Sequence, residues 1–244
     1  MTDFTMSAQT AIPFPMKTKS LLAAFAAVLL ATLSFAQAPA PATPPGAAAL
    51  HQQSLESMKQ KKFKEAVDFA DQATKADPTK PEYFSQLGIA LSQRMSEVNF
   101  MQMAALSGRM RKAFDKSVEL DPNHVPGLIG LARFYTNAPE IAGGSLEKAA
   151  EIAARIEKLD PFTGALELGR IAEKAEKPDE AVAHYDAAAK ANPKSPGALA
   201  AAGRVLAKAG KKDEARARFE AALKINPEHE GAKKGLAELD KPAS

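Results

Sequence analysis

PGALAAAGRVLAKAGKKDEARARFEAALKINPEH, residues 196–229, is the stretch that decides the fold. Its small and apolar residues recur at helical spacing in two groups. They are Leu199, Ala202, Gly203 and Leu206 in the first group, and Ala215, Phe219 and Ala222 in the second, which Pro227 follows. Because small side chains let helix axes approach closely, the stretch predicts two helices that pack against each other.

The same arrangement of residues stands immediately upstream. Residues 162–195 place the matching residue types at the matching intervals: Leu168, Gly169, Ala172, Ala181, Tyr185, Ala188 and Pro193. Five Asp-Pro or Asn-Pro steps divide the chain, and their prolines are Pro78, Pro122, Pro161, Pro193 and Pro227. The stretches 162–195 and 196–229 are each 34 residues long. An internal period of this length indicates a repeat protein built from supersecondary units.

The spacing of small residues, aromatics and helix-ending prolines resembles the tetratricopeptide repeat (TPR) family. The resemblance implies an all-α fold, a right-handed α-solenoid of stacked helix–turn–helix units with a C-terminal capping helix. We expect five units, at 47–80, 81–124, 125–161, 162–195 and 196–229. A capping helix at 230–239 and a tail at 240–244 would follow.

Two segments break the period. The second unit carries about ten extra residues around Val98–Gly108, and the third contains the loop Asn137–Gly144, which is too rich in Pro and Gly for a helix. Ser145 is then a natural N-cap, with Glu147 in the positive first turn. We expect the individual character of this protein to lie in these two segments.

The N-terminal residues predict export. Leu21–Phe35 is an apolar run that follows Lys17 and Lys19 and ends near small residues, the pattern of a secretory signal peptide over residues 1–36. The run is shorter than the roughly 20 residues that cross a bilayer. Cleavage after Ala36 is expected, with a periplasmic or secreted product, and Met16 is a candidate for the true start.

The residues after that cleavage point form a linker. Residues 37–46 are rich in Pro and Ala, and proline lacks the amide that a helix requires. We therefore expect an extended tether between the leader and the repeats.

Composition excludes several classes of protein. There is no cysteine, so disulfides and thiolate metal sites are impossible. The net charge is only +3, and Lys and Glu alternate along the predicted helices, so nucleic acid is not an expected partner. Of the four histidines, His124 and His229 are expected at ordinary surface positions. The sequence holds no catalytic or cofactor-binding motif, so we expect neither an enzyme nor a cofactor or metal site.

Half of the 8 methionines lie in the second unit's insertion, at Met95, Met101, Met103 and Met110. One interpretation is that they fill gaps between a lengthened helix and its neighbours. A second is an adaptable apolar contact surface, and a third is soft-metal binding through thioethers. The last would make the chain an accessory subunit of an envelope enzyme or a metal-handling system that uses residues 95–110.

Three arginines occupy the same position in successive units. Arg133, Arg170 and Arg204 lie on the first helices of units three to five. The TPR resemblance implies that this position lines the inner groove of the solenoid. We call these residues the arginine row and predict that they bind carboxylates of an acidic protein or peptide. A solvated surface whose aliphatic stems cover alanine-rich helices is the alternative.

The favoured function is an exported TPR scaffold that binds a protein or peptide in a concave groove. Fold alone does not dictate function, so this hypothesis depends on the resemblance and on the absence of catalytic motifs. Self-association through the ends of the solenoid is a further possibility.

Overall fold

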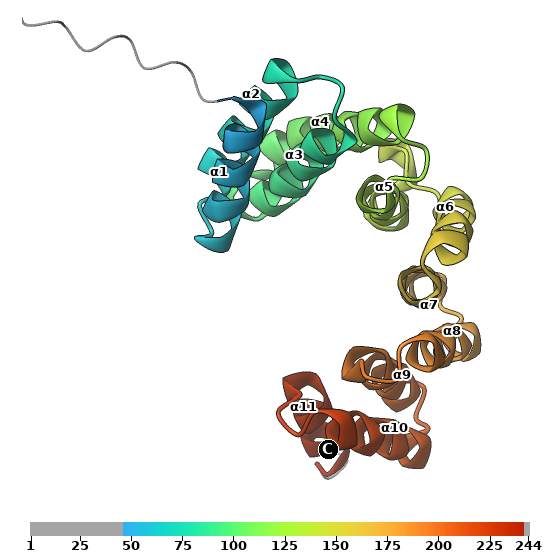
Figure 1. The fold of residues 1–244 in the computed structure, drawn as a ribbon. Coiled ribbons are helices and arrows are strands. Elements are labelled where there is room, and N and C mark those ends of the chain that lie inside the picture. The colour runs from blue at the N-terminus through green and yellow to red at the C-terminus, as the bar shows by residue number, and fades with distance from the viewer. Residues whose placement is uncertain (1–45, 242–244) are drawn as a thin grey trace, which may run out of the picture. The chain divides into compact units, whose positions relative to one another are not determined.

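A computed structural model of the chain describes residues 46–241, and these residues form helices in every repeat. Figure 1 shows that the helices follow one another in chain order. Their bounds are α1 Ala47–Lys59, α2 Phe63–Ala76, α3 Pro81–Arg94, α4 Phe100–Leu120, α5 Val125–Asn137, α6 Leu146–Leu159, α7 Pro161–Lys174, α8 Pro178–Ala191, α9 Pro196–Lys208, α10 Lys212–Ile225 and α11 Glu230–Leu239. There are also two short 3₁₀ turns in this part of the chain. The turn η1, Met95–Glu97, lies between α3 and α4, and the turn η2, Glu140–Ala142, lies between α5 and α6.

The helices pack as successive pairs, α1 with α2 through α9 with α10. Each pair also contacts the next, and the first helices α1, α3, α5 and α7 form a continuous layer. The helix α11 packs on both α9 and α10. This arrangement confirms the predicted all-α solenoid with a terminal helix that covers the last pair.

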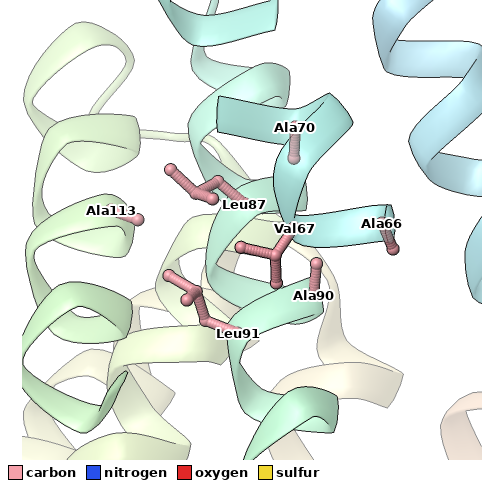
Figure 2. Close-up of a cluster of buried hydrophobic side chains, with 7 residues drawn as sticks. All are labelled: Ala66, Val67, Ala70, Leu87, Ala90, Leu91 and Ala113. Carbon is pink, nitrogen blue, oxygen red and sulfur yellow. The ribbon is translucent and has the colours of Figure 1, made fainter. Parts of the chain in front are cut away.

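Small side chains make the close packing possible. Figure 2 shows one core cluster, in which Val67, Leu87 and Leu91 lie among alanines of α2, α3 and α4. Three of these alanines, Ala66, Ala70 and Ala90, are fully buried. Alanine leaves the helix surfaces close enough for a few larger side chains to fill the space between them.

Buried aromatic rings fill the space beside helical glycines. The Phe114 ring of α4 lies against Gly88 of α3 and Gly130 of α5, and the Phe219 ring of α10 lies against Gly203 of α9 and Gly235 of α11. At each glycine a Cβ atom would fall less than 3 Å from the ring. The glycines are therefore required by the approach of the ring.

The turn inside each regular pair is short. Three residues join α1 to α2, α7 to α8, and α9 to α10, and one residue of each turn has a positive φ. These residues are Lys61, Glu176 and Gly210. A left-handed residue directly after a helix satisfies its last carbonyls, as the bond from the Lys62 amide to the Ser57 carbonyl shows.

The second and third pairs replace this short turn with the two irregular segments. In the second pair, η1 and Asn99 precede α4, which has 21 residues and is the longest helix of the part described. Asn99 caps α4 by accepting a hydrogen bond from the Gln102 amide. The extra residues around Val98–Gly108 thus lengthen both the turn and the N-terminal end of α4.

In the third pair, a compact loop that contains η2 connects α5 to α6. Gly143 has φ of 90°, and a Cβ on Gly144 would fall 1.8 Å from the Ala138 carbonyl oxygen. Both glycines are therefore needed for this path of the backbone. Ser145 caps α6 by accepting from the Lys148 amide, as predicted.

The boundary between the third and fourth pairs differs from the others. Asp160 ends α6 and also caps α7 by accepting from the Thr163 amide, so α7 begins at Pro161 and not after it. Proline is favoured at the first position of a helix, where its missing amide costs nothing. This direct junction explains why only 32 residues separate Pro161 from Pro193.

The predicted signal peptide, the linker up to residue 45 and the end of the tail from residue 242 lie outside the described residues. Within residues 46–241, none of the helices has the length and apolar character to span a bilayer.

Candidate functional site

The two irregular segments line one pocket. This pocket, the apolar groove, has a volume of about 1140 Å³ and lies over α3, α4, α5 and the loop after α5. The lengthened part of α4 contributes Phe100, Met103 and Ala104, and the loop contributes Pro139 and Ile141. Segments that are separate interruptions in the sequence thus become one surface in the structure.

Large apolar side chains are exposed at this groove. Of the lining residues, Phe100 is 80% exposed and Ile141 is 100% exposed, and Met101, beside Phe100 but outside the lining, is 79% exposed. Ile89, which also lines the groove, is 37% exposed. A contiguous exposed apolar surface is typical of an interaction site, whereas scattered single residues are not.

The methionines of the insertion contribute to this surface. Met95, Met103 and Met110 are partly buried and line the groove, while Met101 lies exposed on α4. Met110 also packs against the core of α2, α3 and α4. The residues described thus combine gap filling with an adaptable apolar surface. Among them, no three His, Asp or Glu side chains gather as they would around a metal ion.

The arginine row lies in a second, smaller pocket. This charged pocket, of about 420 Å³, is lined by Arg133, Arg170 and Arg204 together with Glu167, Glu173 and Lys174, as well as by Thr136 and Asn137. The structure therefore brings the three predicted arginines together, on α5, α7 and α9. Four cations and two carboxylates give the lining a net charge of +2.

The arginines are paired with glutamates that sequence analysis did not single out. Arg133 donates from Nε and Nη2 to Glu167, with Nη2 2.7 Å from Oε1, and Arg170 also donates to Glu167. The Glu167 side chain is only 3% exposed. A buried carboxylate requires such partners, so part of the role of these arginines is to join α5 to α7. Glu167 stands three residues before Arg170 within an apolar helical run, a signal that could have indicated the pair.

A second carboxylate joins the fourth and fifth pairs. Arg204 donates from Nη1 and Nη2 to the two Glu173 oxygens, each at 2.7 Å, and Tyr185 Oη donates to Oε1 at 2.5 Å. Burial alone would raise the pKa of Glu173, but the hydrogen bonds from Arg204 and Tyr185 hold it below its ordinary value. Burial, and next the bond to Glu173, raise the pKa of Tyr185.

The apolar groove and the charged pocket adjoin. Arg133 and Asn137, one helical turn apart on α5, line both. Each arginine of the row keeps roughly half of its side chain exposed. An extended ligand can therefore contact apolar and cationic side chains at the same time. The partner-binding role of the arginine row remains a prediction.

The histidines are not gathered into a site. His229 accepts a hydrogen bond from the Ala232 amide and so caps α11. The expectation of ordinary surface positions was wrong for both His124 and His229, because both are partly buried. His124 Nε2 lies 3.0 Å from the Ser85 hydroxyl of α3. Desolvation by this burial lowers the pKa of His124, against the opposing charges of Asp121 and Glu82.

His124 should make the stability of the solenoid depend on pH. The unfolded chain protonates this imidazole near the ordinary histidine pKa of 6.5, while the folded chain protonates it only at lower pH. Between these values the unfolded state binds more protons, so stability falls as the pH falls. His124→Gln should therefore reduce the shift in urea midpoint between about pH 7.5 and about pH 5.5.

Ser85→Ala is the control for this prediction. It removes the hydrogen-bond partner but leaves the partly buried imidazole, so the pH dependence should persist. An unchanged shift in His124→Gln would assign the pH dependence to other groups, among them His51, whose pKa burial also lowers.

Comparison with known proteins agrees with this architecture. Residues 166–230 match the tetratricopeptide repeat family model. No curated protein matches the chain. A thermophilic TPR protein from Thermus thermophilus, TTC0263, has a similar structure, with 18% identity, 80% of this chain and 98% of that chain covered, and a TM-score of 0.64.

Two further solved structures share the fold. MamA from Desulfovibrio magneticus RS-1, from residue 41 to its end, is 16% identical over 75% of this chain and 97% of that chain, with a TM-score of 0.55. YrrB, described as a TPR protein with an unusual peptide-binding site, is 15% identical over 78% of this chain and 92% of that chain, with a TM-score of 0.50. Residues 166–230 thus match tetratricopeptide repeats, and the described residues share the α-solenoid fold of these solved structures.

Proposed function

We propose that this chain is an exported, non-catalytic scaffold and that a partner protein docks on the apolar groove. The observation that carries the proposal is that both irregular segments, 98–108 and 137–144, contribute to the same exposed apolar pocket. Regular repeats need neither segment to stack, so a shared role in binding accounts for both. YrrB, with the same fold, is described as having a peptide-binding site, which supports a partner of this kind.

Export is part of the proposal. Its support is the sequence pattern of residues 1–36, a basic start followed by the apolar run Leu21–Phe35. The mature protein would then begin at Gln37 and meet its partner in the periplasm or outside the cell. An acidic segment of the partner would contact the arginine row, whose pocket carries a net positive charge.

Site-specific photo-crosslinking in intact cells tests the docking surface. A photoreactive amino acid replaces Phe100 or Ile141 in two chains, and exposed Ile225 of α10 in a third as the matched control. We expect the same partner to crosslink to positions 100 and 141 and not to position 225, because only the first two lie at the groove.

The same cells provide the outcome that contradicts the proposal. Crosslinking that is equal at all three positions, or absent from positions 100 and 141, would show that the groove is not a docking surface. Fractionation with N-terminal sequencing of the crosslinked chain tests export separately, since a cytoplasmic chain that retains Leu21–Phe35 contradicts it.

A further inference from the structure

The charged residues that line the apolar groove are all positive. Among the residues that line it, the charged ones are Arg111 of α4 and Arg133 of α5, and no carboxylate is present. Glu167 pairs with Arg133, but Arg111 has only the more distant Asp115 carboxylate beside it. A weakly neutralised cation in an apolar pocket favours a ligand that supplies the opposite charge. The groove therefore differs from a purely apolar surface.

Arg111 is held at the groove but is weakly neutralised. Its Nε lies 4.0 Å from the Asp115 carboxylate, too far for a hydrogen bond, and its guanidinium Cζ stands 5.8 Å from the centre of the Phe134 ring. Its side chain is 43% exposed. Among the described residues, no side chain or carbonyl accepts a hydrogen bond from this guanidinium.

Arg133 and Arg170 also keep donors for a ligand. Arg133 uses Nε and Nη2 toward Glu167, and Arg170 uses only Nη1. The remaining guanidinium nitrogens have no acceptor among residues 46–241. Because Glu167 already balances one positive charge, the two arginines together retain attraction for a second carboxylate.

We propose that the apolar groove and the charged pocket form one composite site for an amphipathic peptide segment. Its apolar side chains occupy the groove over α3–α5, and a neighbouring Asp, Glu or C-terminal carboxylate contacts Arg111, while Arg133 adds positive charge where the two pockets adjoin. This inference depends on the proposed function and adds the chemical class of the partner. The groove volume suits several side chains of a peptide, and its cations disfavour a basic segment.

Selection from a random peptide library on the purified full chain is the experiment. We expect enriched peptides to combine leucine, phenylalanine or similar residues with Asp or Glu. For the leading peptide, replacing its carboxylates with the corresponding amides should weaken binding, measured by fluorescence anisotropy, about tenfold, the usual size of a charge-assisted hydrogen bond.

Variants of the chain test the cationic and the apolar part of the site separately. Arg111→Gln should bind the acid and amide peptides almost equally, while Arg109→Gln, on the same helix but outside both pockets, is the matched control. Phe100→Ser with Ile141→Ser should weaken both peptides together. Phe100 and Ile141 are exposed, and Arg111 has no hydrogen-bond acceptor among the described residues. We therefore expect all of these variants to fold, and circular dichroism checks this.

Several outcomes would overturn the inference. They are enrichment without acidic residues, an Arg111→Gln variant that still prefers the acid peptide, and no enrichment at all. A dimer in sedimentation that Phe100→Ser breaks would instead make a second copy of this chain the occupant. Each can occur while positions 100 and 141 still crosslink to a partner in cells, so failure of this inference is distinguishable from failure of the proposed function.

Discussion

Replacing Phe114 with alanine should lower the free energy of unfolding by about 3 to 5 kcal/mol. The Phe114 side chain is 3% exposed, and its ring fills the space between Gly88 of α3 and Gly130 of α5. Neither glycine has a side chain that could move into the vacated volume. The cavity would therefore persist and would weaken the contact between the second and third pairs of helices.

Urea unfolding followed by circular dichroism measures this effect, and Phe100→Ala is its control. Phe100 lies on the same helix but is 80% exposed, so its replacement should change stability by no more than about 0.5 kcal/mol. Equal unfolding midpoints for the two variants would show that the Phe114 ring does not join the pairs.

Gly130→Ala should destabilise the fold by about 1 to 3 kcal/mol, although alanine normally favours a helix. A Cβ at this position would fall 2.3 Å from Cδ1 and Cε1 of the Phe114 ring. The ring cannot move away freely, because a Cβ at Gly88, on the other side, would be only 2.5 Å from it. Overpacking should therefore exceed the gain in helix propensity.

Gly108→Ala provides a control with the opposite sign. Gly108 lies in α4 with no atom within 4 Å of the position of a Cβ, so alanine should stabilise by about 0.5 to 1 kcal/mol. A second test combines Gly130→Ala with Phe114→Leu, whose effects should not add if the ring and the new methyl group collide. Stabilisation by both alanine substitutions would contradict the prediction.

The arginine row illustrates how far the sequence leads toward the site. The repeat period places Arg133, Arg170 and Arg204 at equivalent positions, and the structure brings them to one pocket. The period cannot show that Glu167 is buried between two of them, because ion pairing depends on how neighbouring pairs are rotated. The sequence-based hypothesis of a carboxylate-binding row therefore acquires two internal carboxylates that a ligand must accommodate.

The amino-acid sequence by itself determined the all-α repeat architecture, since small residues at helical spacing and prolines between helices act locally and recur along the chain. It also located the two interruptions, Val98–Gly108 and Asn137–Gly144. Only the tertiary structure decided that these segments share one groove, next to the arginine row. The reason is physical: a repeat period fixes contacts within and between adjacent helices, whereas residues outside the period take positions set by the packing of α3, α4 and α5 together.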